Sequence, residues 1–306
     1  MRLLLAWTLL SSALRVSGTG VPLLFQGGSA GNGLPDREGS IRIAVDLQLT
    51  GASALMTGRE LEHLRDNILP AAAVWIRRLT RLRNATQGPL RLPPQCEQTL
   101  DWGYGVIGSG VQVSVTRTCV QYMAENRCGV ATVPPSLLAS APLCSTGSPT
   151  DCRPTGEGEG LAGADLLLFV TAAATPACDA PWKPVFIAAP PCARDPANDR
   201  PLAGNINVCP GRLSTSPSNS RRIVANFVRE VLTVMAFDSS SLPYFRRGDG
   251  EPLVARGAGG VPEGSEGVVE MFFEGGRGVE STRQVWRGGD PAQTGRAIGL
   301  TPHSME

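Results

Sequence analysis

The most restrictive feature of this 306-residue chain is a set of eight cysteines that all lie within one region. They are Cys96, Cys119, Cys128, Cys144, Cys152, Cys178, Cys192 and Cys209. No two of them form a C-x-x-C pair, so their spacing does not favour a zinc site. An even number of cysteines gathered in one region is typical of an exported protein that disulfides cross-link. The sequence therefore predicts up to four disulfides, with their pairing left open.

Export is also indicated by the N-terminus. A positive charge, a short apolar core and then small residues mark residues 1–18 as a secretory signal. Residues 19–40 are rich in glycine and polar residues, which predicts a flexible leader. The sequon Asn84-Ala85-Thr86 fits a secreted surface turn and makes Asn84 a candidate glycosylation site. We therefore expect a secreted or cell-surface protein.

Several classes of function are disfavoured by counts and spacing. The chain has two histidines, His63 and His303, so it cannot by itself build a site of three histidines. A net charge of +1 argues against nucleic-acid binding. The glycines at 103, 105 and 108 precede a strand-like segment, and a phosphate-binding loop needs a helix there. Arg247-Gly248-Asp249 is the tripeptide that some adhesion receptors read, and it is equally an ordinary turn sequence.

Hydrophobic patterns predict strands at three places. Residues 41–49 and 111–115 alternate apolar with polar or small residues, as half-buried strands do. Residues 166–170 form a continuous apolar run, which is typical of a strand buried on both faces. No stretch reaches the roughly 18 apolar residues of a membrane-spanning helix.

Two helices are predicted as well. Thr57 can cap a helix that extends to residue 82 and that Pro70 kinks or restarts. A second amphipathic helix is expected over residues 221–237, capped at one of the residues 218–220. The segment 175–217 is rich in proline and cysteine, and we expect it to be an ordered, cross-linked loop region.

Four groups of residues occur in a fixed order along the chain. They are residues 68–72 with 88–96; residues 163–170 followed by Cys178 and Cys192; Asp199-Arg200-Pro201-Leu202-Ala203-Gly204 leading to Asn207-Val208-Cys209-Pro210; and Tyr244-Phe245-Arg246 with residues 249–253. In order and spacing they resemble the leishmanolysin family of zinc metalloendopeptidases, most closely its animal-type branch. The resemblance covers residues 41–256 well and residues 257–302 loosely.

The resemblance implies an α+β fold. Residues 41–256 would form a zincin- or metzincin-like N-terminal subdomain, with a twisted mixed sheet and a helix of the active-site type. Residues 257–306 would be the truncated start of a central subdomain, so the C-terminal part of the family fold would be incomplete. The family also implies that membrane association could occur, although the sequence contains no hydrophobic anchor.

The family carries its zinc motif, H-E-x-x-H, on the helix that precedes Tyr-Phe-Arg. Histidines four apart lie on one helix face and reach one metal, and the glutamate activates the metal-bound water. In the aligned stretch Arg229 and Thr233 occupy the histidine slots and Glu230 keeps the glutamate slot. Arginine is permanently cationic and cannot bind Zn²⁺, and threonine is a poor ligand. Glu230 is then an ordinary helix carboxylate, paired with Arg229 or Arg247.

The third zinc histidine of the family would come after residue 306, and neither His63 nor His303 falls in a ligand slot. The resemblance therefore implies that zinc, the family cofactor, is not held here. Three hypotheses follow. The chain is a binding or adhesion module for an unidentified protein or peptide ligand, without peptidase activity. Alternatively, it is an active zinc metalloendopeptidase whose sequence is incomplete. Finally, it is a truncated product that folds poorly.

Overall fold

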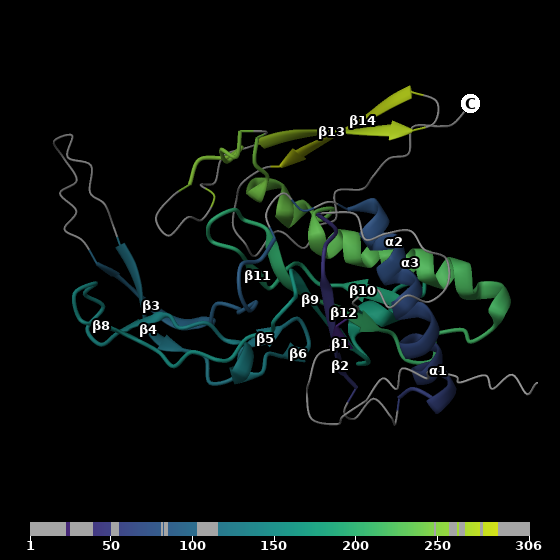
Figure 1. The fold of residues 1–306 in the computed structure, drawn as a ribbon, viewed down its shortest axis with the longest axis horizontal. Helices are drawn as coiled ribbons and strands as arrows, with labels where there is room; N and C mark the ends of the chain where they lie inside the picture. Colours follow the sequence, from purple (N-terminus) through teal and green to yellow (C-terminus); the bar gives the residue numbers. More distant parts are fainter. Residues whose placement is uncertain are drawn as a thin grey trace, which may run out of the picture.

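The computed structural model describes residues 23–24, 39–49, 55–80, 82, 85–102, 116–247, 249–256, 262, 267–275 and 278–286. Figure 1 shows a central sheet with long helices on one face and small hairpins extending to one side. Several predictions fall outside the described residues: the signal, Asn84, the strand at 111–115, the glycine-rich loop and His303. Within the described part, no helix combines the length and the apolar character needed to cross a bilayer.

The central sheet is mixed. Its strands follow the order β1 (Leu23–Leu24), β2 (Ile43–Gln48), β9 (Leu166–Thr171), β12 (Pro201–Val208) and β10 (Phe186–Ala188), and β11 (Ala193–Arg194) also pairs with β12. The three middle strands are parallel, whereas β1, β10 and β11 are antiparallel to their neighbours. Every residue of β9 is buried, so the predicted strand with two covered faces is confirmed.

The expectation of a loop region over residues 175–217 was wrong, because β10, β11 and β12 all lie there. The strand β12 begins at a proline and places Asn205 and Asn207 in its buried interior, which hides the apolar pattern of a core strand. These amides are satisfied within the sheet. The Asn205 Nδ2 donates to the Phe169 carbonyl at 3.1 Å, and the Asn207 Oδ1 accepts from the Thr171 hydroxyl at 3.0 Å.

The first predicted helix is present, and of the two alternatives at Pro70 the structure has the restart: a new α-helix begins there after a π-helical turn. It consists of α1 (Gly58–His63), a π-helical turn η2 (Leu64–Ile68) and α2 (Leu69–Leu79), which follow one another directly. Thr57 caps it as predicted, since its hydroxyl accepts from the Glu60 N–H and the Glu60 carboxylate accepts from the Thr57 N–H. Pro70 lies in the first turn of α2, where a missing N–H is tolerated.

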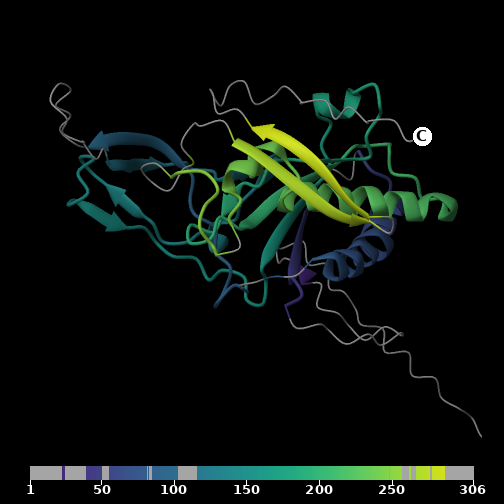
Figure 2. The ribbon, with the colours of Figure 1, turned by 90° about the horizontal axis from the view of Figure 1, so that it is seen from above.

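The second predicted helix is α3 (Ser220–Met235), preceded by the short helix η5 (Pro217–Asn219). It lies beside α2 on one face of the sheet (Figure 1, Figure 2). Alternate residues of the strands face these helices and form one buried cluster with them, including Ile43, Val45, Leu166, Leu168, Ile206, Phe227 and Val231. The remaining strand residues face the other way and pack under residues 90–92 and 128–137, in a second cluster that contains Leu167 and Phe169.

The hairpins at the side are small and cross-linked. They are β3 (Cys96–Trp102) with β4 (Thr116–Tyr122), β5 (Arg127–Cys128) with β6 (Ala131–Thr132), and β7 (Pro142–Cys144) with β8 (Cys152–Pro154). Short helices η3 (Pro135–Leu137), η4 (Pro176–Asp179) and η6 (Ser239–Tyr244) and a hairpin of β13 (Gly267–Gly275) with β14 (Gly278–Trp286) complete the described elements. The α+β class is confirmed.

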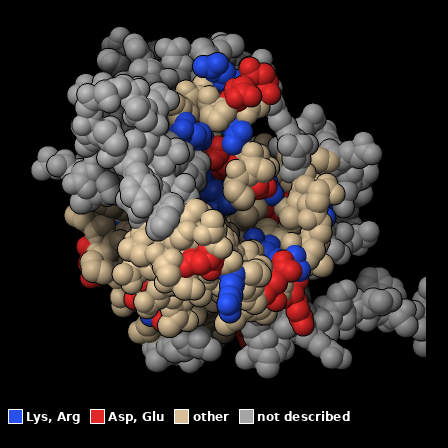
Figure 3. Space-filling view, turned by 90° about the vertical axis from the view of Figure 1, so that its left-hand side faces the viewer, with Lys and Arg blue, Asp and Glu red and all other residues tan. Residues whose placement is uncertain are grey.

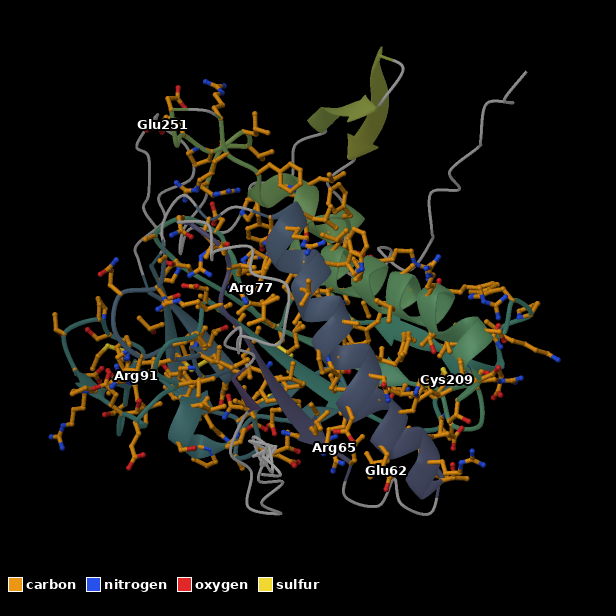
Figure 4. All side chains as sticks on the ribbon, turned by 45° about the vertical axis from the view of Figure 1, so that its right-hand side comes forward. Glu62, Arg65, Arg77, Arg91, Cys209 and Glu251 are labelled. Atoms are coloured by element: carbon orange, nitrogen blue, oxygen red, sulfur yellow. A yellow bond between two sulfur atoms is a disulfide. The ribbon has the colours of Figure 1, made fainter. Side chains whose placement is uncertain are left out.

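All eight cysteines are paired, so the prediction of four disulfides is confirmed. Two pairs, Cys96–Cys119 and Cys144–Cys152, close individual hairpins. The pair Cys128–Cys192 joins β5 to the segment before β11, and Cys178–Cys209 joins η4 to the end of β12. Figure 4 labels Cys209 at this end of the sheet. Two of the bonds therefore connect the periphery to the sheet.

A buried carboxylate organises the beginnings of the parallel strands. Asp165 has no solvent exposure, and its two oxygens accept from the Arg42 Nε and Nη2, each at 2.8 Å, and from the Thr86 N–H at 2.7 Å. Arg200 extends the network by donating to the Thr86 hydroxyl at 2.7 Å. Burial by itself raises the pKa of the Asp165 carboxyl, but the hydrogen bonds from Arg42 and Thr86 outweigh it and hold this pKa below its usual value.

This network predicts acid sensitivity. Since the pKa of Asp165 is lower in the folded chain than in the unfolded chain, its contribution to stability is present above the unfolded pKa and is lost as the pH falls through the folded value. Asp165→Asn should lower the free energy of unfolding at neutral pH by about 3 kcal/mol and flatten its dependence on pH below about 5. Urea titrations across this range measure both effects. The control is Asp66→Asn, which removes an exposed pair with Arg65 and should cost less than about 1 kcal/mol; equal losses in the two variants would refute the assignment.

The close approach of α3 to the sheet gives a second prediction. A Cβ added at Gly204 in β12 would lie 2.2 Å from the Val234 Cγ1 of α3, so the helix has to move away. Gly204→Ala should therefore destabilise the fold by about 1–3 kcal/mol, measured by thermal unfolding. At Gly156 an added Cβ meets nothing within 4 Å, and Gly156→Ala should leave the midpoint unchanged. Equal midpoints for the two variants would show that α3 does not pack on β12 this closely.

Candidate functional site

The candidate site lies where α3 passes the antiparallel edge strand β10. The apolar side of α3 buries Ile223, Phe227, Val231 and Val234. The ring of Phe227 meets that of Phe186 in β10 edge-to-face, with centroids 5.2 Å apart, so the helix is fixed against this strand. Glu230 lies next to the apolar row and is only 7% exposed. The fold thus places one carboxylate between the helix and the edge of the sheet.

The Glu230 carboxylate is occupied by two partners. One oxygen accepts from the Ala188 N–H of β10 at 3.1 Å, and the other accepts from the Arg229 Nε at 3.0 Å and from the Arg229 Nη2. The Ala189 N–H bonds to β12, so the neighbouring Ala188 N–H points to the outer side of β10. Glu230 therefore ties α3 to the free edge of the sheet. Of the two arginines that were expected to pair with Glu230, Arg229 and Arg247, the structure shows Arg229.

Arg229 and Thr233 lie one turn apart on α3, as their spacing predicts. The Arg229 side chain is 70% exposed apart from its contact with Glu230. The Thr233 hydroxyl donates to the Arg229 carbonyl at 3.1 Å, so it is used by the backbone of its own helix. This face of α3 presents a guanidinium, a paired carboxylate and an engaged hydroxyl. Such a donor set does not fit Zn²⁺, which takes imidazole, thiolate or free carboxylate ligands.

No other part of the described chain offers a ready metal site. Among the described residues, the one group of potential ligands close enough together is Cys144, Asp151 and Cys152. Its two sulfurs are joined in a disulfide, so neither is a thiolate. His63 ends α1 and belongs to no such group.

A second polar cluster fixes the chain that follows α3. The Asp199 Oδ2 accepts from Arg246 and from Arg256, at 2.8 Å in each case, and the Arg194 guanidinium lies 4.2 Å from the centroid of the Tyr244 ring. Burial lowers the pKa of Arg194. The structure thus joins the Asp-Arg-Pro and Tyr-Phe-Arg groups of the sequence. Figure 3 shows basic and acidic side chains side by side on one face of the molecule.

Sequence reasoning missed both of these connections. The Ala188 N–H carries no signal in the sequence, because only the sheet pairing decides which way it points. In the sequence, Asp199 stands out only as the first residue of the Asp-Arg-Pro-Leu-Ala-Gly group. Its backbone adopts a φ of 60°, which is unusual for a residue other than glycine, and its arginine partners lie about fifty residues away in sequence.

Comparison with known proteins gives a consistent answer. No protein-family model matches the chain, and no solved structure matches it. The leishmanolysin-like peptidase of Drosophila melanogaster is 30% identical over 198 residues, which cover 63% of this chain and 27% of that protein. The leishmanolysin-like peptidase of Caenorhabditis briggsae is 27% identical over 74% of this chain and 33% of its own length. That of Caenorhabditis elegans is 28% identical over 68% of this chain and 30% of its own length.

Fold and site together define a disulfide-linked α+β domain with one long helix beside an antiparallel edge strand. The similarities to the curated peptidases support membership of the leishmanolysin family, which the four groups of residues predicted. The chain spans about a third or less of the length of these relatives.

The bonds of Glu230 predict a structural role that can be measured. Glu230→Ala leaves the Ala188 N–H without an acceptor and should lower the free energy of unfolding by about 1–3 kcal/mol. Glu230→Gln keeps an acceptor oxygen and should cost less. Thr233→Val, which removes only a bond to the helix backbone, should change stability by no more than about 0.5 kcal/mol. A Glu230→Ala variant as stable as the wild type would contradict a structural role for the bond between Glu230 and β10. Unchanged stability is the result expected of a glutamate that serves catalysis alone.

Proposed function

We propose that this member of the leishmanolysin family binds a protein or peptide ligand at the cell surface or outside the cell and does not hydrolyse peptide bonds. The observation that carries the proposal is the state of α3, where Arg229 neutralises Glu230 and Thr233 bonds to its own helix. The family resemblance assigns these positions to the zinc ligands and the general base.

The chemistry of peptide hydrolysis explains why these residues matter. A peptidase of this family needs a metal to acidify water and a free carboxylate to take its proton. Arg229 instead contributes a permanent positive charge, which repels a cation. It also pairs with the carboxylate that would have to accept the proton. Both requirements are therefore opposed by the same side chain.

The sheet supports a zincin-like interpretation of the fold. The helix that follows β12 packs across the face of the sheet and directs its carboxylate to an antiparallel edge strand. Apart from the Ala188 N–H, which Glu230 occupies, the outer side of an edge strand has backbone groups that an extended peptide can bind as an added strand. A module of this kind would keep the ability to bind a chain after losing the ability to cut it.

The proposed location rests on the disulfides. Four disulfides form and persist in an oxidising compartment. Export through the signal at residues 1–18 and glycosylation at Asn84 belong to the same proposal. Thr86, the last residue of the sequon, is ordered and partly buried through its bonds to Asp165 and Arg200.

Metal analysis tests the proposal. The chain, secreted from a eukaryotic host, should contain less than about 0.1 zinc per molecule and leave casein intact with or without added zinc. Arg229→His with Thr233→His places two imidazoles four residues apart, and should bind zinc at least about tenfold more tightly than the wild type in calorimetry.

The matched control is Arg221→His with Arg222→His, which adds two exposed histidines to the same helix at a spacing that cannot share a metal. The control should bind zinc no better than the wild type. Stoichiometric zinc in the wild-type protein, lost on chelation together with cleavage of casein, would overturn the proposal and establish an active metalloendopeptidase.

A further inference from the structure

A turn at one end of the central sheet presents a tryptophan to solvent. The Lys183 N–H donates to the Ala180 carbonyl at 2.9 Å, which closes a four-residue turn with Pro181 and Trp182 at its centre. The Trp182 side chain is 78% exposed, which is the largest value among the large apolar side chains of the described chain. Lys183 has a φ of 48°, and prolines on both sides of the Trp-Lys pair restrict the backbone. A constrained turn therefore holds the indole away from the core.

The turn is fixed to the end of β12. The Cys209 N–H donates at 2.9 Å to the carbonyl of Val185, just after the turn, and the Cys209 disulfide joins η4, just before it. The Arg212 N–H in turn donates to the Cys209 carbonyl at 3.2 Å, and the Arg212 side chain is exposed. Arg212 therefore lies at the same end of the sheet as the turn. Figure 4 labels Cys209 there, on the opposite side of the molecule from Glu251.

The first turn of α3 adds two more cations to this end. The rings of Phe186 and Phe227 meet at the start of β10, and the Ala188 N–H meets Glu230 at its end. Strand and helix therefore run in the same direction, and the beginning of α3 lies beside the segment that precedes β10. The exposed pair Arg221-Arg222 belongs to this first turn of α3.

The charge of this end is not neutralised within the described chain. No ion pair or side-chain hydrogen bond among the described residues engages its four cations, Lys183, Arg212, Arg221 and Arg222. The segments 176–185 and 209–222 contain one acidic residue, Asp179, whereas the whole chain has a net charge of +1. Two guanidinium groups in the first turn of a helix also oppose its dipole, so the stability of α3 does not account for them. We call these four residues, together with Trp182, the Trp182 surface.

We propose that the Trp182 surface binds sulfated polysaccharide. Guanidinium groups form charge-assisted hydrogen bonds with tetrahedral oxyanions, and a polymer of repeated sulfates engages several separated cations at once. The exposed indole of Trp182 provides an apolar face for a sugar ring. An anionic bilayer would meet the same charges, but anionic lipids face the cytoplasm. The choice of polysaccharide therefore rests on the extracellular location proposed above.

Binding to heparin tests the proposal with a defined probe. The full chain, secreted from a eukaryotic host, is passed over immobilised heparin at about 0.15 M NaCl. We expect saturable binding that soluble heparin abolishes, that desulfated heparin leaves intact, and that weakens steeply as the salt concentration rises. Vesicles of phosphatidylcholine with phosphatidylserine form the second arm, and they should retain less of the protein than heparin does.

Matched variants locate the binding on the Trp182 surface. Arg221→Gln with Arg222→Gln should weaken heparin binding more than about tenfold and reduce the slope of log affinity against log salt by about two. The control is Arg153→Gln with Arg247→Gln, which removes two exposed charges from β8 and from the turn at Glu251 (Figure 1, Figure 4). It should change the affinity less than about twofold, because these charges lie more than a screening length away.

A third variant tests the indole. Trp182→Ala should weaken heparin binding about threefold or more, and it should leave the thermal midpoint unchanged because the side chain is exposed. Midpoints at or above that of the wild type show that all the variants are folded.

Several results would overturn the proposal. They are absence of heparin binding by the wild-type chain, equal binding to desulfated heparin, equal affinities of the two double variants, and a Trp182→Ala chain that binds as tightly as the wild type. Stronger binding to the vesicles than to heparin would also overturn it, and would assign the surface to an anionic membrane. None of these results depends on zinc content or on casein cleavage, so failure here is distinguishable from failure of the proposed function.

Discussion

The Asp165 carboxylate determines where the parallel part of the sheet begins. Parallel strands are joined by long crossovers, so no tight turn sets their register. Here Arg42 precedes β2, Asp165 precedes β9 and Arg200 precedes β12, and all three meet at Thr86. A carboxylate without solvent exposure has to keep its partners, because an unpaired buried charge is costly. The three strands therefore have one common starting point, and the position of α3 after β12 follows from it.

A second buried carboxylate, Asp199, fixes the segments that flank the helix α3 in a similar way. It joins the turn before β12 to Arg246 and Arg256 beyond α3, so the chain on both sides of the helix is fixed to one point. The disulfide Cys178–Cys209 holds the other end of β12. With α3 packed directly over Gly204, little freedom is left for the helix to shift relative to the edge strand. The contact between Glu230 and Ala188 depends on this rigidity.

Local patterns predicted the elements whose residues follow a simple period. The buried strand β9, the capped helix that begins after Thr57 and the amphipathic helix α3 are in this class. The strand β12 escaped because its asparagines are satisfied only across the sheet, by Phe169 and Thr171. Likewise, eight cysteines predict four bonds but not which residues pair, and a glutamate on a helix does not reveal a backbone partner on a distant strand. Each of these unpredicted features is a contact between segments far apart in the sequence.

The same contacts explain which residues of α3 the fold requires. Its stability rests on Ile223, Phe227, Val231 and Val234, which face the sheet, and on Glu230, which reaches β10. The two positions that the family resemblance assigns to zinc histidines lie outside this buried row, and Arg229 and Thr233 make only local bonds with their own helix. The fold therefore accommodates arginine and threonine at these positions without a change in the buried packing of α3. Glu230 differs because its carboxylate also bonds to the sheet, so the fold alone gives a physical reason for a glutamate at this position. The fold therefore constrains the glutamate position of α3 but not the two neighbouring positions, and a glutamate there is not by itself a sign of activity.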